Sequence, residues 1–275
     1  MNNMKLNTAI NQYSQSILPT KSLNYQKALR SQFRHWSTHL GEYRLSRITP
    51  QLVQDHLPDG SPATRNRYVS ALSVVYGECG DQNPCRSIKR GKEIWRVRFL
   101  SDQEKIALLD ACRRSRSKIL YPVVILALWT GLRKMEILKL EWNRVDLHRG
   151  LIHLIETKGG RPRTIPIMGH ALELISQLPR TSRYIFPTRT GEYRRHLADC
   201  WYPMIRSAGI EDLTFHHLRH HFASTLALQG VPLYDISVLL GHKNISQTQR
   251  YAHLSVGHLR GVLAGLDNHL FGGAP

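Results

Sequence analysis

The sequence contains few cysteines and no long apolar segment, and these absences exclude several classes of protein. Its four cysteines, Cys79, Cys85, Cys112 and Cys200, form no CxxC pair and are too scattered for a zinc site or a disulfide framework. No run of about eighteen apolar residues occurs, which argues against a membrane-spanning helix, and the N-terminus lacks an apolar signal region. We therefore expect a cytoplasmic protein with no membrane segment and no metal site.

Acidic residues are also scarce relative to basic ones. Lys and Arg number 38 against 20 Asp and Glu, which gives a formal net charge of +18. Residues 1–98 hold 15 basic and 6 acidic side chains, and the remaining residues hold 23 and 14. At 275 residues the chain can form two modest domains. A basic surface on both of them indicates a polyanion that both domains touch.

Residues 1–88 have the pattern of a small helical domain. Tyr25, Leu29, Phe33, Trp36 and Leu40 recur at steps of three or four, which predicts one apolar face on a helix over residues 24–40. Two further helices are expected to begin where a capping residue precedes a proline, at positions 49–50 and 61–62.

Two arginines, Arg65 and Arg67, follow the second of these helix starts and point away from its apolar face. They contact phosphate groups or belong to a solvated face, and the sequence leaves both interpretations open. Residues 89–98 are basic and have no clear period, which is typical of a linker between domains.

Residues 99–275 are expected to form a mainly helical domain with a small antiparallel β-sheet. A capping box at Ser101–Glu104 predicts a helix start, and the apolar stretch 121–130 must be buried. Short strands are expected at 145–147, 151–155 and 163–167, and helices near 171–178 and 195–208.

The last quarter of the chain gathers a phenol, a guanidinium and several imidazoles. Thr214 or a neighbour can cap a helix on which His216 and Arg219 lie three residues apart and share a face. His242 follows Gly241 at a helix end, and Tyr251 comes nine residues later. A tyrosine oxygen can attack phosphorus and hold it covalently. Without a metal, arginines and histidines must stabilise the resulting charge.

Two upstream motifs supply the remaining groups that this chemistry needs. Arg133 follows a glycine turn and opens a helix, and Glu136, three residues on, can brace it. Lys158 lies at a turn between two short strands, where it can protonate a leaving oxygen.

These motifs together make the chain resemble the tyrosine recombinases, the family of phage integrases and chromosome-dimer resolving enzymes. The matching pieces are Thr-Gly-Leu-Arg-x-x-Glu, Thr-Lys-Gly-Gly, His-x-x-Arg-His, Leu-Gly-His and a tyrosine nine residues further on, in the family's order. The resemblance covers roughly residues 99–260 by motif and 5–88 only by general pattern. His217 departs from it, because family members often carry an acidic residue there.

The resemblance implies a helical core-binding domain (1–88), a basic linker (89–98) and a catalytic domain (99–275) that clamp DNA between them. It implies that Tyr251 forms a 3′-phosphotyrosine, that Arg133 and Arg219 stabilise the phosphorane, that Lys158 acts as the acid, and that His216 and His242 position the phosphate and share proton transfer. Glu136 and His220 support them, and no ATP, metal or other cofactor is needed. The expected DNA contacts are Arg65, Arg67, Lys89, Arg90, Lys92, Arg161 and Arg163.

The implied partners are double-stranded DNA with specific recombination sites and further copies of the chain. A dimer would occupy one site, and a homotetramer would exchange strands through a Holliday junction, with possible accessory DNA-bending or directionality proteins. Leu259, Val262, Leu263, Leu266 and Leu270 predict an amphipathic C-terminal helix, which docks on its own core or on a neighbouring protomer. A type IB topoisomerase and a non-catalytic DNA-binding regulator stay open as alternatives.

Overall fold

The computed structural model describes residues 4–79, 82–93, 98–155 and 162–255. Contacts between residues divide the chain into two compact units, Met1–Trp95 and Arg96–Pro275. Each unit encloses its own hydrophobic core. The division falls within the stretch that the sequence marks as a linker, residues 89–98.

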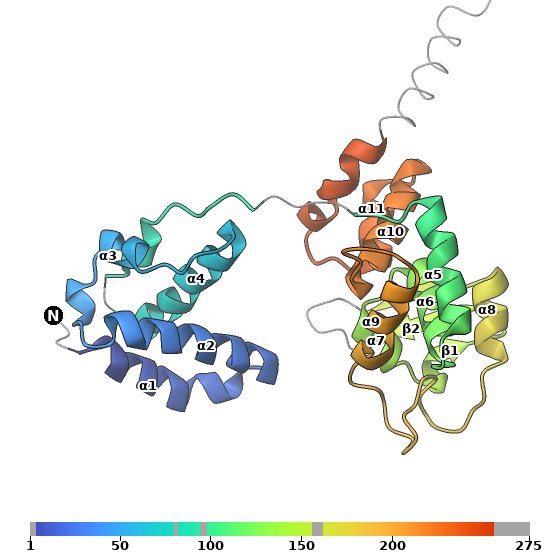
Figure 1. The fold of residues 1–275 in the computed structure, drawn as a ribbon, viewed down its shortest axis with the longest axis horizontal. Coiled ribbons are helices and arrows are strands. Elements are labelled where there is room, and N and C mark those ends of the chain that lie inside the picture. Colours follow the sequence, from blue (N-terminus) through green and yellow to red (C-terminus); the bar gives the residue numbers. More distant parts are fainter. Residues whose placement is uncertain (1–3, 80–81, 94–97, 156–161, 256–275) are drawn as a thin grey trace, which may run out of the picture. The chain divides into compact units, whose positions relative to one another are not determined.

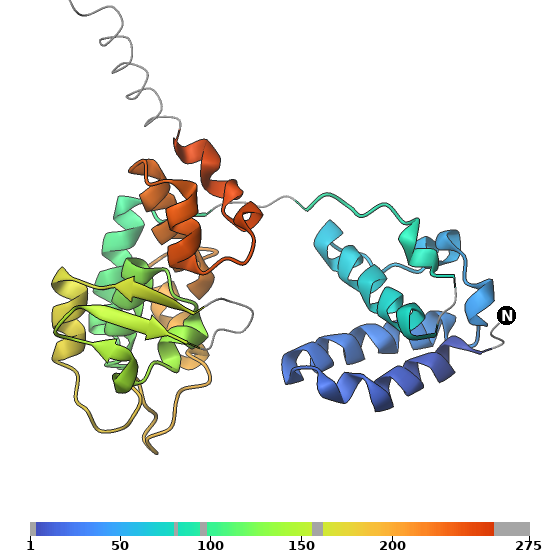
Figure 2. The ribbon, with the colours of Figure 1, turned by 180° about the vertical axis from the view of Figure 1, so that it is seen from behind.

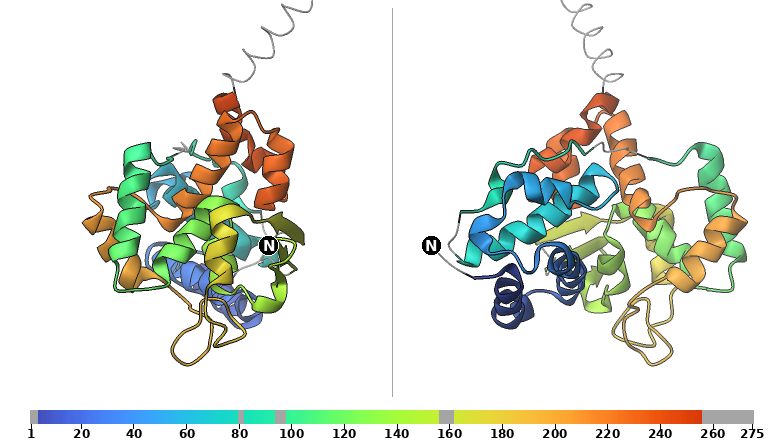
Figure 3. Two further views of the ribbon diagram at one scale, coloured as in Figure 1. Left: turned by 90° about the vertical axis from the view of Figure 1, so that its right-hand side faces the viewer. Right: turned by 60° about the vertical axis from the view of Figure 1, so that its left-hand side comes forward.

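Among the residues that the structure describes, the first unit is a small bundle of four α-helices (Figures 1 and 3). They are α1 (Leu6–Ser16), α2 (Leu23–Leu40), α3 (Pro50–Asp55) and α4 (Pro62–Cys79). Trp36 on α2 is fully buried and donates its indole N–H to the Tyr68 carbonyl of α4, at 3.0 Å. Helices α3 and α4 begin as predicted, because the hydroxyls of Thr49 and Ser61 accept backbone N–H groups from their first turns.

The apolar face predicted for residues 24–40 is confirmed except at its first member. Leu29, Phe33, Trp36 and Leu40 are buried, whereas Tyr25 is 42% exposed. Tyr25 lies in the first turns of α2, outside the hydrophobic core of this unit.

The second unit combines seven α-helices of the described chain with one three-stranded sheet. The helices are α5 (Asp102–Arg114), α6 (Leu120–Thr130), α7 (Lys134–Leu138), α8 (Gly169–Ser176), α9 (Ala198–Ser207), α10 (Phe215–Leu228) and α11 (Leu233–Leu240). The strands are β1 (Val145–Asp146), β2 (Leu151–Leu154) and β3 (Arg163–Pro166), and they pair antiparallel in the order β1-β2-β3. Buried Ile152 and Ile165 lie opposite each other in the register and face the core. Figure 2 shows the sheet lying across one side of the unit.

Helix α6 is the centre of the second unit and sets the position of the site described below. It is apolar on nearly every side and packs against α5, α8 and α10. It ends at Gly131, whose φ of +62° is a left-handed conformation that suits glycine. A Cβ there would lie 2.3 Å from the Phe222 ring, so the backbone can pass close to α10 only as glycine. The turn delivers Arg133 to the start of α7.

The predicted fold class, mainly helical with a small antiparallel sheet, is confirmed. In the part of the chain that the structure describes, no helix is long and apolar enough to cross a membrane.

Candidate active site

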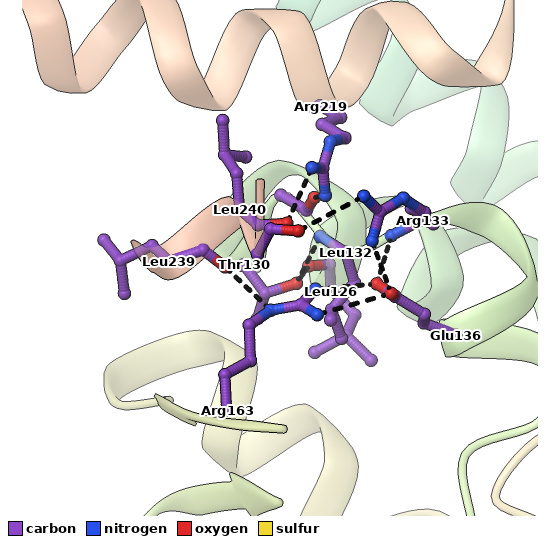
Figure 4. Close-up of polar contacts among 11 residues, drawn as sticks. Leu126, Thr130, Leu132, Arg133, Glu136, Arg163, Arg219, Leu239 and Leu240 are labelled. Atoms are coloured by element: carbon purple, nitrogen blue, oxygen red, sulfur yellow. Dashed lines mark hydrogen bonds and ion pairs between the residues drawn. The ribbon is translucent and has the colours of Figure 1, made fainter. Parts of the chain in front are cut away.

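Arg219 joins two distant turns of the second unit. Its side chain extends from α10 and is only 3% exposed. One terminal nitrogen donates to the Gly131 carbonyl at 2.8 Å and the other to the Leu240 carbonyl at 2.7 Å (Figure 4). Burial, reinforced by the nearby charge of Arg133, lowers the pKa of Arg219 to about 9. The cation is therefore held in a place where an added anion would be stabilising.

Arg133 and Glu136 are coupled through both backbone and side chain, as the sequence predicts for a brace. The Glu136 carboxylate accepts the Arg133 backbone N–H at 2.9 Å and its guanidinium at 2.8 Å. A second guanidinium nitrogen of Arg133 lies 3.5 Å from the Gly241 carbonyl. The Arg133 side chain remains 33% exposed, whereas that of Glu136 is only 9% exposed. Arg133 is thus held by Glu136 while part of its side chain stays open to solvent.

Arg163 was predicted to face DNA, but in the structure its side chain is buried among protein groups. Its side chain is 5% exposed, and its guanidinium pairs with Glu136 at 2.8 Å and donates from Nε to the Leu239 carbonyl at 3.0 Å. The physical reason is that a buried carboxylate and a helix-end carbonyl outcompete solvent for this guanidinium. Figure 4 shows Arg163 extending from β3 toward Glu136, with Arg219 approaching from α10.

Positive charge exceeds negative charge in this cluster. The guanidinium groups of Arg133 and Arg163 pair with the carboxylate of Glu136, and that of Arg219 lies near enough to feel the charges of Arg133, Arg163 and Glu136. Burial favours protonation of Glu136, but pairing with Arg163 and Arg133 holds the pKa of its carboxyl below the usual range. The carboxylate therefore stays ionised, and the cluster carries an excess of about two positive charges at neutral pH.

His216 and His217 occupy the first turn of α10. His217 Nδ1 accepts the backbone N–H of Thr214 at 3.0 Å, the role that an acidic residue fills in a capping box. This contact explains how histidine can replace the acidic residue often found at this position in the family. His216 keeps an exposed face beside a cavity of about 340 Å³, which Arg219, Lys134 and the aromatic rings of Trp201 and Phe215 also line.

His242 is oriented by a residue that the sequence did not single out. Its Nδ1 pairs with the hydroxyl of Thr248 at 2.8 Å, and Thr248 is fully buried. The Thr248 carbonyl in turn accepts the Tyr251 backbone N–H at 2.9 Å. The only sequence signal was the place of Thr248 between the histidine and the tyrosine, which does not by itself indicate a contact.

Tyr251 lies on the 3₁₀ helix Gln249–Ser255 and is 1% exposed. Its hydroxyl is hydrogen-bonded to Nδ1 of His220 on α10. Burial raises the pKa of Tyr251, while Arg250 and Arg219 oppose that rise. The phenol is thus neutral and enclosed in this structure, and His220 is hydrogen-bonded to the tyrosine.

The three imidazoles are poor proton binders in this environment. Surrounding protein, followed by Arg219, lowers the pKa of His216 and of His242 to about 4. Burial and then His216 lower the pKa of His220 to about 3. All three rings are neutral near pH 7, so each can accept one hydrogen bond and donate another.

Several predicted residues lie outside this cluster. Arg65, Arg67, Lys89, Arg90 and Lys92 are exposed on the first unit. Asn66, between the two helical arginines, holds the basic stretch against α4: its carbonyl accepts Arg90 Nη1 at 2.5 Å, and its side chain accepts the Gly91 N–H at 3.0 Å. The sequence did not predict that the basic stretch around Arg90 would bind the helix that carries Arg65 and Arg67.

Lys158, Arg161 and the apolar residues of the C-terminal stripe lie outside the described residues. Among the residues that the structure does describe, no three His, Cys, Asp or Glu side chains form a group suited to a metal ion.

Comparison with known proteins matches the chain to a family of integrases and to individual recombinases and integrases. The family model described as "Phage integrase family" matches residues 98–258. The shufflon-specific DNA recombinase of Escherichia coli is 28% identical over 251 residues, which cover 86% of this chain and 62% of that protein. The chain spans less than two thirds of the length of the curated relatives first matched.

Two solved structures share the fold at low identity. The Tn1549 transposon integrase in complex with transposon right end DNA has a TM-score of 0.79 at 16% identity and covers 95% of this chain and 100% of that chain. A lambda integrase tetramer bound to a Holliday junction has a TM-score of 0.72 at 19% identity and covers 88% of this chain and 79% of that chain.

Proposed function

The chain belongs to the phage integrase family, and we propose that it is a site-specific DNA recombinase in which Tyr251 is the nucleophile. The observation that carries the proposal is the excess of positive charge near this tyrosine: Arg133 and Arg163 share the Glu136 carboxylate, and the buried guanidinium of Arg219 is bonded only to the carbonyls of Gly131 and Leu240 among the contacts of the described residues. Enclosed guanidinium groups without matching anions are unfavourable, so the cluster favours an incoming anion. A DNA phosphodiester fits, because the arginine fork can engage two phosphate oxygens at once.

The proposed reaction proceeds in two displacements at one phosphorus atom. The Tyr251 oxygen attacks the scissile phosphate, the bond to the 5′-oxygen breaks, and the protein becomes joined to the 3′-phosphate. The phenol proton passes to a neutral imidazole, whose pKa the bound phosphate raises by offsetting the nearby arginine charges, and Lys158 donates a proton to the leaving 5′-oxygen. A 5′-hydroxyl from a partner strand then attacks the phosphotyrosine and gives its proton back to Lys158, while the bond to Tyr251 breaks and its oxygen takes back the proton held by the imidazole. One phosphodiester is exchanged for another, so the sequence of steps needs no ATP.

The described residues divide this work by their positions. Arg133 and Arg219 would stabilise charge on the pentacoordinate phosphorus, because they are anchored before the phosphate arrives. His216 and neutral His242 would hydrogen-bond the phosphate oxygens. Tyr251 is 1% exposed and bonded to His220, so its hydroxyl must leave that contact before it can reach DNA.

DNA binding is assigned to both units. Arg65, Arg67, Lys89, Arg90 and Lys92 present exposed charges around Asn66, and phosphate neutralisation by such residues dominates affinity for a duplex. We assign the second unit to cleavage.

A homotetramer on a Holliday junction is the proposed assembly, supported by the shared fold of the lambda integrase tetramer. The four free cysteines suit action in a reducing cytoplasm.

Recovery of covalently bound DNA tests this proposal directly. The protein is mixed with supercoiled plasmids that carry a genomic library, the mixture is denatured, and DNA attached to protein is sequenced. Wild-type protein should give adducts at defined sites, and Tyr251→Phe should bind DNA but give none. Tyr234→Phe is the matched control, because Tyr234 is 68% exposed on α11 and should retain adduct formation.

Other outcomes separate the alternatives. Undiminished adduct with Tyr251→Phe would remove this residue as the nucleophile. Plasmid relaxation without exchanged products would indicate a topoisomerase. Sequence-selective binding by the wild-type protein without any adduct would indicate a DNA-binding regulator.

A further inference from the structure

The C-terminal end of α11 is closed by backbone bonds and by arginines from three different elements. The last four carbonyls of a helix have no partner within it. Here the Ser237 carbonyl accepts the His242 N–H and the Val238 carbonyl accepts the Gly241 N–H, both at 3.0 Å. This pair of bonds is a Schellman motif. The carbonyls of Leu239 and Leu240 remain.

Arginine side chains take up these remaining carbonyls in order. Arg163 donates to Leu239 at 3.0 Å and Arg219 to Leu240 at 2.7 Å. The Gly241 carbonyl, one residue further, lies 3.5 Å from Arg133 Nη2. Cations are favourable at this end of a helix because its dipole places partial negative charge there. His242 follows directly, so the same arrangement fixes the backbone that carries it.

Arg163 differs from the other two arginines because it has no exposed part with which to reach a substrate. Its side chain is 5% exposed, against 33% for Arg133. Its guanidinium is bonded within the protein, twice to Glu136, at 2.8 and 3.4 Å, and once to the Leu239 carbonyl. Glu136 in turn holds the backbone and the guanidinium of Arg133.

We propose that Arg163 is a positioning residue for strand cleavage, which orients Arg133 through Glu136 and His242 through the end of α11. The inference rests on the proposed recombinase chemistry. Loss of Arg163 would leave Glu136 with one cationic partner and the Leu239 carbonyl without a donor. Both phosphate-binding groups would then lose a support while their own side chains stay intact.

Gly241 supplies an independent sign of how closely this guanidinium is packed. A Cβ at position 241 would lie 2.6 Å from Arg163 Nη1 and 2.8 Å from its Cζ. The φ of Gly241 is +64°, so a side chain there is also strained. Alanine at this position must therefore displace Arg163 as well as distort the turn.

The first test compares Arg163→Met and Arg163→Lys with wild type in single-turnover cleavage. The probe is a synthetic duplex containing the site recovered from the covalent adducts. Arg163→Met should slow cleavage at saturating DNA by about 10²-fold, since displacement of catalytic groups by about 1 Å has effects of that size. DNA affinity should stay within about threefold of wild type, because the buried Arg163 side chain supplies no phosphate contact that the substitution could remove. Arg163→Lys should restore little of the cleavage rate, because one ammonium group cannot make the two bonds to Glu136 and the bond to the Leu239 carbonyl at the same time.

The pH profile separates positioning from general loss of structure. Without Arg163, the burial that raises the pKa of Glu136 is opposed by fewer cations, with Arg133 as the remaining hydrogen-bonded one. The acid limb of the cleavage rate should therefore shift to higher pH in Arg163→Met. The matched control, Arg149→Met, removes an arginine whose side chain is 76% exposed, and it should change neither rate nor profile.

Three results would overturn the proposal. Weakened DNA affinity with a normal rate at saturation would make Arg163 a DNA contact. A normal rate and a normal profile would leave it no role in cleavage. Slower cleavage with an unshifted acid limb would mean that Arg163 does not act through Glu136.

A second measurement needs no DNA and therefore stands if the recombinase assignment fails. Gly241→Ala is introduced into wild type and into Arg163→Lys, and thermal unfolding is compared across the four proteins. Because backbone strain at position 241 is common to both backgrounds, the difference isolates the contact with the Arg163 guanidinium. Gly241→Ala should lower the melting temperature less in the Arg163→Lys background. Equal losses would show that the guanidinium is not held against Gly241.

Discussion

Acidification should destabilise the second unit through the imidazoles of the site. The pKa of His220 is lowered to about 3, by burial first and then by His216, and that of His242 to about 4, by burial first and then by Arg219. In an unfolded chain the pKa of histidine is about 6.5. The unfolded state therefore binds more protons below that pH. The contribution of these neutral rings to stability is fully present above about pH 6.5 and is lost as the pH falls toward 4.

The size of the loss follows from these values. Between pH 7 and pH 5, one fully shielded ring with such a pKa would account for about 2 kcal/mol of the free energy of unfolding. His220 and His242 are only partly buried, so solvent screening reduces the effect to about 1–2 kcal/mol for each ring. His216 shifts in the same direction, but its exposed face reduces its share further.

Urea unfolding of the full chain at pH 7, 6 and 5 measures this effect. His220→Asn should reduce the pH dependence of the second unit's transition by about 1–2 kcal/mol, because asparagine does not titrate there. The transition of the first unit is an internal reference, since the substitution lies outside it. His196→Asn, at a side chain that is 64% exposed, is the matched control. An unchanged pH dependence in His220→Asn would refute the view that the fold holds His220 neutral.

Further predictions concern the proposed chemistry and assembly. Arg133→Ala or Arg219→Ala should slow cleavage by roughly 10²-fold or more in single-turnover assays, and near-normal cleavage by Arg219→Lys would contradict the bidentate role. Lys158→Ala should recover activity on a substrate with sulfur at the 5′-bridging position, because that leaving group needs no proton; an equal defect there would exclude Lys158 as the acid. Removing residues 257–275 should preserve binding to one site but abolish cooperative binding to paired sites in gel shifts. Retained cooperativity would exclude the tail as the assembly element.

Local rules in the sequence determined where many elements begin and end. Thr49, Ser61 and Ser101 cap helices as predicted, because each cap bond joins groups only three residues apart. Gly131 and Gly241 end helices in the left-handed conformation for an equally local reason. The motifs also located the charged and imidazole groups that the fold brings to one cluster, although only their chemistry, not their contacts, could be predicted.

Only the tertiary structure decided which of these groups touch. Arg163 contacts Glu136 and Leu239, which are 27 and 76 residues away in the chain. Lys158 and Arg161 shortly precede it in the sequence, so the local pattern indicated an exposed arginine. The pairing of Tyr251 with His220, and of His242 with Thr248, likewise depends on how α10, α11 and the 3₁₀ helix pack. The exposure of a charged side chain depends on the partners that surround it, and here a buried carboxylate and a helix end supply those partners from distant parts of the chain.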